Sequence, residues 1–295
     1  PWNLGAHSMD RGLPSQVLRK HVSEWCQASA PESGTRSRPT QHQTWNDRRQ
    51  HLTASARCGH ELVMQYCDIE KAFDGSGLIC RGGFRPGLDD GVPGPAGAGA
   101  VVIVGNAGPM MWREFASAVD AERRQTEANP LNDWTRIVVD SIAAGVGARA
   151  LYPFDGPPYL PFHRWAMRTG AVHSSPIGLL IDPVYGLWHA YRAALVFADG
   201  FDLPALTRTA NPCDSCTEKP CLNTCPVTAF SDVNYDVPAC AEHIAALEGS
   251  DCLAASCRAR RACPVGRDFI YAPDQARFYM ERFLRAVRKR RLNPG

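Results

Sequence analysis

The sequence predicts a mixed α/β (α+β) protein in which a sheet domain is followed by a small cysteine-rich domain. A β-branched run at residues 100–104, bounded by glycines, is followed by two helical patterns and then by further strand patterns. This is the order expected of a sheet covered by helices. Eight of the twelve cysteines lie between residues 213 and 263, after the last of these strands. A chain of 295 residues is long enough to hold both parts.

The individual elements follow from apolar spacing and from the positions of glycine and proline. Short β-branched or alternating runs predict strands over residues 100–104, 148–152, 177–181 and 187–197. Apolar residues at helical spacing predict helices over residues 60–73, 110–128, 132–146, 237–247 and 274–292. Asn132 is the expected N-cap of the third helix.

Turns and loops are expected where glycine and proline gather. Segments 82–95 and 153–161 should be loops, and residues 105–108 should form a turn after the first strand. Residues 182–186 should join the last two strands as a hairpin.

Composition excludes several classes of protein. The hydrophobic fraction of 44% and the charged fraction of 21% are typical of a globular domain, and a net charge of +2 provides no global field that favours nucleic acid. No apolar stretch reaches the roughly 18 residues that a membrane-spanning helix needs. We identify no export signal, so closely spaced cysteines favour metal over disulfides, and we expect a cytoplasmic protein.

The cysteines form two runs, each closed by a Cys-Pro pair. The first run reads C-x2-C-x4-C-x3-C-P over residues 213–226, and the second is looser and ends at Cys263-Pro264. Bacterial ferredoxins carry C-x2-C-x2-C-x3-C-P, in which the fourth cysteine binds the cluster of the other run. The extra residues here widen the loops but leave eight thiolates, the number that two [4Fe–4S] clusters require.

The proline after each closing cysteine turns the chain away, which frees that sulfur for the opposite cluster. The predicted ligands of cluster one are Cys213, Cys216, Cys221 and Cys263. The predicted ligands of cluster two are Cys225, Cys240, Cys252 and Cys257. The alternatives are all-thiolate zinc sites and free or disulfide-bonded thiols. The remaining cysteines are interpreted as bystanders: Cys26, Cys58, Cys67 and Cys80.

With a sheet domain ahead of two cysteine runs, the chain resembles epoxyqueuosine reductase and the reductive dehalogenases. Residues 185–192 and 202–204 are similar to the segment that leads into the cluster domain of epoxyqueuosine reductase, and Cys240 is similar to its isolated cysteine. Residues 177–194 also resemble cobalamin-processing proteins of the cblC type. The resemblance covers about residues 97–270. It implies a nitroreductase-like domain that holds a corrinoid, and a bacterial-ferredoxin-like domain with two [4Fe–4S] clusters.

The same resemblance suggests residues for the sheet domain. Residues 154–160 are similar to a segment of epoxyqueuosine reductase with a proposed proton donor, which implies that role for Asp155. A general acid needs a raised pKa, which desolvation by prolines and aromatic rings could supply. The alternative is a turn residue before a glycine. The expected cofactor-binding residues are Trp188, His189, Tyr191 and Arg192, for which core packing is the alternative.

We therefore expect four parts: an irregular arm (1–56), an α/β cofactor domain (57–204), a dicluster domain (205–270) and a C-terminal helix packed back on the α/β domain (271–295). The expected function is an iron–sulfur oxidoreductase. An external donor of the ferredoxin or flavodoxin type would supply electrons to the clusters, which pass them to a corrinoid, or to a flavin, and to a small-molecule substrate. The alternatives are a non-catalytic electron carrier, a corrinoid-handling protein, and a purely structural role for the metal.

Overall fold

A computed structural model describes residues 64–94, 97–206, 208–231 and 234–292. These belong to one compact unit that spans residues 64–295. The predicted arm (1–56) and the first residues of the predicted helix 60–73 lie outside the described residues. The mixture of helices with a sheet confirms the predicted α/β class.

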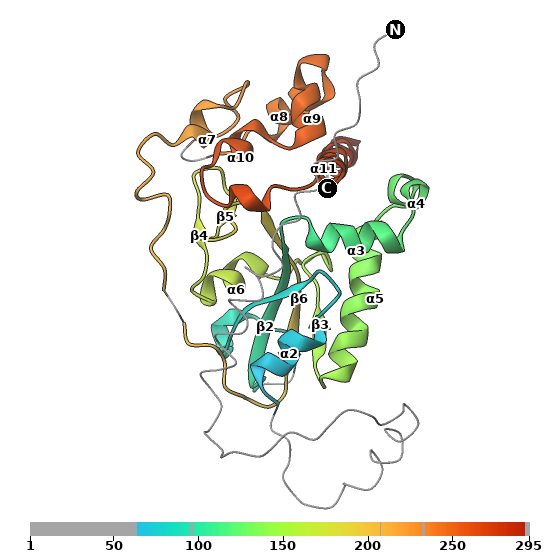
Figure 1. The fold of residues 1–295 in the computed structure, drawn as a ribbon, viewed down its shortest axis with the longest axis vertical. Coiled ribbons are helices and arrows are strands. Elements are labelled where there is room, and N and C mark those ends of the chain that lie inside the picture. The colour runs from blue at the N-terminus through green and yellow to red at the C-terminus, as the bar shows by residue number, and fades with distance from the viewer. Residues whose placement is uncertain (1–63, 95–96, 207, 232–233, 293–295) are drawn as a thin grey trace, which may run out of the picture. The chain divides into compact units, whose positions relative to one another are not determined.

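Four antiparallel strands form the main sheet, in the order β1-β2-β6-β3 (Figure 1). Their bounds are β1 Ile79–Phe84, β2 Ala100–Ala107, β3 Arg149–Leu151 and β6 His189–Phe197. Every residue of β2 is buried, as the β-branched run predicts for a central strand. A second, two-stranded sheet consists of β4 (His173–Ser174) and β5 (Leu180–Ile181).

Alternation along β2 divides the core into two layers. Val102 and Val104 pack in one apolar cluster with α3 (Met110–Ala118) and α5 (Pro130–Gly145), whereas Ile103 packs in another with α6 (Phe162–Arg168). Successive side chains of a strand point to opposite faces, so each layer receives every second residue. Helices α2 (Tyr66–Ala72) and α4 (Ala121–Thr126) complete this part of the unit.

A β-bulge interrupts the pairing of β2 with β6. Val104 pairs with Ala193, but Gly105 pairs with Tyr191, so Arg192 is an extra residue in β6. Such an insertion changes the direction in which side chains point on either side of it. This bulge lies within the segment for which the sequence predicts cofactor-binding residues.

The cysteine-rich part consists of short helices that gather beyond one end of the sheet (Figure 1). They are α7 Pro220–Asn223, α8 Val237–Ala245, η2 Leu247–Gly249, α9 Ser250–Ala255, α10 Arg258–Ala262 and η3 Arg267–Phe269. The last helix, α11 (Pro273–Leu292), packs against α8 and α9, and its Phe278 joins the apolar cluster of α3 and α5. The predicted domain boundaries at residues 205 and 271 stay predictions.

Several predicted elements differ in detail. The predicted helix 110–128 is two helices, because Asp120 caps a new helix by accepting a hydrogen bond from the Arg123 backbone N–H. Helix α5 begins at Pro130, after Asn129 at the N-cap position, so the prediction of Asn132 as N-cap is wrong. Strand β1 was missed because Gly82 and Gly83 suggested a loop.

The strand and hairpin predictions also need correction. Strand β2 continues to Ala107, so residues 105–107 are strand rather than turn. The predicted hairpin between residues 177–181 and 187–197 is wrong, because β5 pairs with β4 while β6 joins the main sheet. Residues 182–186 do form a closed turn, with hydrogen bonds in both directions between Asp182 and Gly186.

No helix in the described ranges is both long enough and apolar enough to cross a membrane.

Replacing Phe115 by Ala should lower the free energy of unfolding by about 3–5 kcal/mol, because loss of a buried ring leaves a cavity. Phe115 is 0% exposed, and its ring lies 5.3 Å from that of Trp112 and 5.8 Å from those of Trp134 and Phe278. Ile137→Ala is the control, since Ile137 is 73% exposed on α5 and its change should stay within about 0.5 kcal/mol. Urea unfolding followed by tryptophan fluorescence compares them, and equal midpoints would contradict the packing.

Candidate functional site

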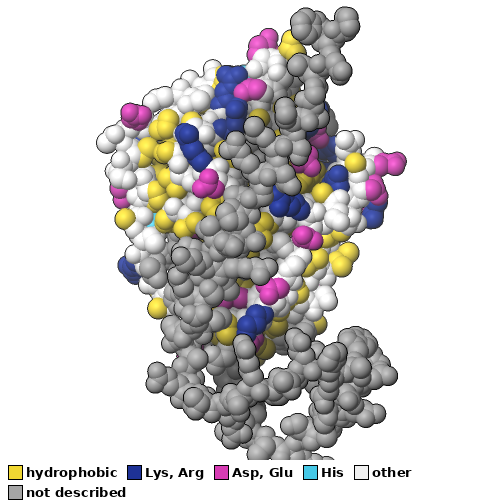
Figure 2. All heavy atoms as spheres, viewed as in Figure 1, with side chains coloured by type: hydrophobic (Ala, Val, Ile, Leu, Met, Phe, Trp, Pro, Cys, Tyr) yellow, Lys and Arg dark blue, Asp and Glu magenta, His cyan; other side chains and the backbone are white. Residues whose placement is uncertain are grey.

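The first candidate site is a pocket lined by four cysteines. Its cysteines are Cys213, Cys216, Cys221 and Cys263, and the space between its walls is about 320 Å³. The rest of the lining consists of one cation, two aliphatic residues and four prolines: Lys219, Ile181, Val265, Pro176, Pro212, Pro220 and Pro264. In Figure 2, hydrophobic side chains, a class that includes Cys and Pro, gather at the upper left of the face shown, over the region of α7 and α10 in Figure 1. Apart from Lys219, the side chains that line this pocket are therefore thiols and apolar groups.

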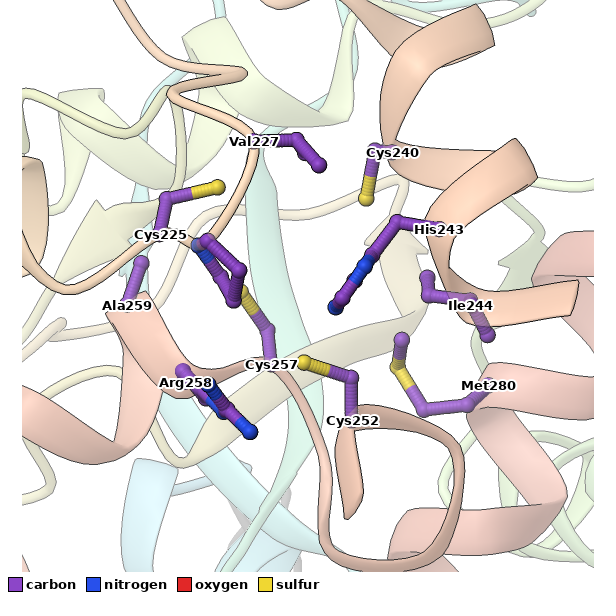
Figure 3. Close-up of a pocket in the computed structure, with 11 residues that line it drawn as sticks. Cys225, Val227, Cys240, His243, Ile244, Cys252, Cys257, Arg258, Ala259 and Met280 are labelled. Carbon is purple, nitrogen blue, oxygen red and sulfur yellow. The ribbon is translucent and has the colours of Figure 1, made fainter. Parts of the chain in front are cut away.

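The second candidate site is a similar pocket with the other four cysteines (Figure 3). Its cysteines are Cys225, Cys240, Cys252 and Cys257, and the space between its walls is about 280 Å³. Helices α8 and α9 supply Cys240 and Cys252, whereas Cys225 follows α7 and Cys257 precedes α10. The remaining wall is mainly apolar and includes Ile244 and Met280.

Both closing cysteines reach the pocket of the other run. Cys225 belongs to the first run but lines the second pocket, and Cys263 belongs to the second run but lines the first pocket. Because Cys221 and Cys225 are four residues apart, at most about 14 Å of chain joins the two pockets there. Helix α10 joins them again, since Cys257 precedes it and Cys263 follows it. The structure thus brings together the same two sets of four cysteines that the Cys-Pro pairs predict; their binding of clusters stays a prediction.

The thiols within each pocket oppose one another's ionisation. Burial, and after it the three other thiolates of its set, raises the pKa of Cys213 to about 11. Burial, with an addition from two thiolates of its own set, raises the pKa of Cys257 to about 11. Four thiolates in one such pocket therefore need a cationic group to balance their charge.

Backbone amides point at several of these sulfurs. The Ala229 N–H donates a hydrogen bond to Cys225 Sγ at 3.3 Å. Burial raises the pKa of Cys263, and a hydrogen bond from the backbone of Val265 partly offsets this rise. Such donors stabilise sulfur as an anion, which is the form that binds metal.

The donors of each pocket are four thiols, and the described residues form no ready site for a single metal ion. In tetrahedral zinc sites the Zn–S distance of about 2.3 Å places the sulfurs about 3.8 Å apart. In the described part of the chain, His, Cys, Asp and Glu side chains form no group of three or more that could hold one metal ion. The ten cysteines of that part are all free thiols, so a disulfide framework is not observed there. Four thiols in each pocket are the donor type and number that one [4Fe–4S] cluster requires, and binding of such a cluster stays a prediction.

The predicted cofactor residues of β6 are distributed over two faces of the sheet. His189 is buried, with Nε2 3.0 Å from the Leu180 carbonyl oxygen, and its ring meets the Tyr191 ring edge-on at 5.6 Å. Burial first, and then the cations Arg81 and Arg260, lower the pKa of His189 to about 2, so its imidazole is neutral. His189 is buried with its Nδ1 unpaired and Tyr191 is partly buried, and cofactor binding by either residue stays a prediction.

Arg192 lies on the opposite face from His189, as strand alternation places residues three positions apart, and it points toward α5. Its guanidinium donates to Thr135 Oγ1 at 3.0 Å and to Asn132 Oδ1 at 2.9 Å. Arg192 also lines a third pocket with Tyr279 and Arg282 of α11, in which the space between the walls is about 490 Å³. His189 and Arg192 therefore face opposite sides of the sheet, and cofactor binding by Arg192 stays a prediction.

Trp188 contacts the cysteine-rich part directly. It is 1% exposed, and the Arg260 guanidinium lies 4.6 Å from its ring centre and 4.5 Å from that of Tyr271. Arg260 also donates to the Leu187 carbonyl oxygen at 3.0 Å. Because Arg260 belongs to α10, this stack joins the end of β6 to the helix between Cys257 and Cys263.

Asp155 lies at the surface. Its side chain is 48% exposed and forms an ion pair with Arg136 of α5. The Arg136 guanidinium also covers the Tyr152 ring at 4.3 Å. This exposure does not supply the desolvation that the sequence argument requires of a proton donor, and a catalytic role for Asp155 stays a prediction.

Sequence reasoning missed a buried ion pair beside the first pocket. Arg81 of β1 donates to Asp182 Oδ2 at 2.7 Å, and the two side chains are 5% and 7% exposed. Asp182 Oδ1 also accepts from the Val184 and Tyr185 amides, which closes the turn 182–186. The pairing links residues 101 positions apart, so no local pattern could have revealed it.

The turn held by this ion pair fits against the loop that carries Cys263. Gly186 has φ +57°, and a Cβ there would lie 2.0 Å from the Val265 carbonyl oxygen. A Cβ on Gly266 would lie 2.3 Å from the Tyr185 carbonyl oxygen. Two glycines thus let the turn and the Cys263 loop approach backbone to backbone.

Comparison with known proteins finds weak structural likeness. No family model and no curated protein matches the chain. The chain is similar to the B12-trafficking protein CblC of C. elegans, at 12% identity over 74% of this chain and 94% of that one, with a TM-score of 0.42. It is also similar to epoxyqueuosine reductase from Bacillus subtilis, at 16% identity over 68% of this chain and 64% of that one, with a TM-score of 0.40.

These are the protein families that the sequence resembles. Epoxyqueuosine reductase with an epoxyqueuosine-modified tRNA-Tyr stem loop matches with the same identity, coverage and TM-score. The chain spans less than two thirds of that enzyme. Likeness at this level leaves the chemistry to be argued from the residues of this chain.

Replacing Asp182 by Asn should lower the free energy of unfolding by about 3–5 kcal/mol, because it leaves the buried Arg81 without its counter-charge. Asp155→Asn is the matched control, since it breaks an exposed pair with Arg136 and should cost at most about 1 kcal/mol. Denaturant titration of both variants gives the comparison. Similar stabilities would mean that the Arg81 pair does not hold the turn.

Proposed function

We propose that this protein is an iron–sulfur oxidoreductase that transfers electrons through two [4Fe–4S] clusters. The observation that carries the proposal is the pair of adjacent pockets, each lined by four cysteines and each completed by the closing cysteine of the other run. In the proposal Cys213, Cys216, Cys221 and Cys263 hold one cluster. Cys225, Cys240, Cys252 and Cys257 hold the other.

The surroundings of the pockets suit such a role. When bound, a [4Fe–4S] cluster accepts and donates one electron at a time. Apolar side chains border both sites: Ile177, Ile181 and Leu187 at the first, and Ile244, Phe283 and Leu284 at the second. They exclude water, and backbone N–H groups directed at sulfur offset part of the negative charge. Two such sites joined by α10 provide a short route for electrons.

The proposal places the electron acceptor in the sheet part of the unit. Support comes from the stack of Trp188, Arg260 and Tyr271, which connects β6 with the helix between the two pockets. An external donor of the ferredoxin or flavodoxin type would reduce the clusters. A corrinoid, with flavin as the alternative, would accept the electrons and pass them to a small-molecule substrate. A non-catalytic carrier or corrinoid-handling protein is the second candidate, because the same stack would serve reduction of a cofactor that is then handed on.

Iron and acid-labile sulfide, measured on anaerobically purified protein, test the proposal. About eight irons and eight sulfides per chain are expected, with EPR signals from two reduced clusters. Zinc in place of iron, or thiols without metal after anaerobic reconstitution, would refute it.

Incubation of the reconstituted protein with hydroxocobalamin, and separately with flavin, tests the second cofactor. We expect the visible spectrum of one of them to stay with the protein through gel filtration. Turnover of the bound cofactor or of a substrate then separates an enzyme from a carrier. Retention of neither cofactor would leave an electron carrier as the function.

Double variants should reveal the exchange of closing cysteines. Cys263→Ala should remove about four irons, and adding Cys213→Ala should remove no more, because both residues line the first pocket. Adding Cys252→Ala to Cys263→Ala should remove the other four, because Cys252 lines the second pocket. Cys67→Ala is the control with eight irons, since Cys67 lines neither pocket. The reverse pattern of losses would assign Cys263 to the second cluster.

A further inference from the structure

A histidine shares the second pocket with the four cysteines. His243 lies on α8 three residues after Cys240, so both side chains are on the same face of the helix. Both line the pocket that Cys225, Cys252 and Cys257 also line. In Figure 3 the imidazole extends from α8 toward the middle of the pocket, between Cys240 and Cys252. Sequence reasoning assigned no role to this residue.

The tip of this imidazole has no hydrogen-bond partner within the protein. His243 Nε2 is buried and unpaired. A buried polar atom without a partner is costly, so its position calls for an acceptor in the pocket. Arg258, the one cationic lining residue, is directed to Asp251 at 2.8 Å. Apart from Met280, the other side chains that line the pocket with acceptor atoms are the four cysteines.

The backbone of His243 is held in place. A Cβ on Gly249 would lie 1.9 Å from the His243 carbonyl oxygen, so the start of α9 packs directly on the end of α8. Asp236 caps α8 by accepting from the Ala239 N–H at 2.9 Å, and the neighbouring Ile244 is 2% exposed. The backbone that carries the imidazole is therefore fixed beside the pocket.

We infer that His243 Nε2–H donates a hydrogen bond to a sulfur atom of the second cluster and thereby raises the reduction potential of that cluster. The inference rests on the proposed function and adds a residue that tunes one cluster. A cluster gains one negative charge when it accepts an electron from its donor, so a fixed N–H donor stabilises the reduced form more than the oxidised form. No histidine lines the first pocket, whose lining N–H donor is the flexible Lys219, so the two clusters have different donors and should differ in potential.

The test is a redox titration of reconstituted full-length protein, followed by EPR. His243→Leu should retain about eight irons. The reduction potential of one cluster should fall by at least about 59 mV, which for one electron is a tenfold change in the reduction equilibrium. The other cluster serves as the internal reference. His243→Gln, whose amide N–H can take the place of Nε2–H, should restore most of the shift. His163→Leu is the matched control on the exposed face of α6 and should change neither potential.

The outcomes separate the inference from the proposed function. Absence of iron–sulfur clusters in the unsubstituted protein would refute the function. Two intact clusters with unchanged potentials in His243→Leu would refute the hydrogen bond alone. If His243→Leu loses four irons, His243→Gln decides: recovery of iron and potential supports a donor. Continued loss would instead show that the imidazole is a metal ligand, which overturns the inference.

Discussion

Burial of eight thiols in two small pockets is the constraint on which the cysteine-rich part depends. Eight thiols lie in two small apolar pockets, where burial and like charges raise the pKa of Cys213 and Cys257 to about 11. A fold of short helices cannot hold four such anions together unless a cationic group balances them. In the proposed function, the irregular segments around α7 and α10 surround these groups. Cys225 and Cys263 each complete the pocket of the other run.

The sheet provides the rigid side of this arrangement. Its end contacts the cysteine-rich part through the Trp188–Arg260 stack and through the close approach of Gly186 to Val265. The buried pair of Arg81 and Asp182 holds the turn that makes this approach. Such a pair contributes to positioning more than to net stability, because desolvation offsets much of its Coulomb attraction. The loop that carries Cys263 thus packs against the turn 182–186, which directly precedes the end of the sheet.

His189, Arg192 and His243 have different chemical surroundings inside the protein. In β6, Arg192 points toward α5, whereas the neutral His189 lies on the other face of the sheet. On α8, helical spacing instead places His243 beside Cys240. Each histidine has one buried nitrogen without a partner: His189 Nδ1 lies in the packed interior, whereas His243 Nε2 lies at a pocket lined by cysteines.

Local sequence determined much of this protein: the mixed fold class, the central strand β2, helices α8 and α11, and the grouping of cysteines by their Cys-Pro pairs. These depend on periodicity, chain stiffness and spacing, which a short window contains. The tertiary structure decided strand β1, the partner of β5, the bulge at Arg192 and the Arg81–Asp182 pair. Each of these features depends on residues far apart in the chain. Their burial and their charge partners are therefore set by tertiary packing and cannot be predicted from a short window of sequence.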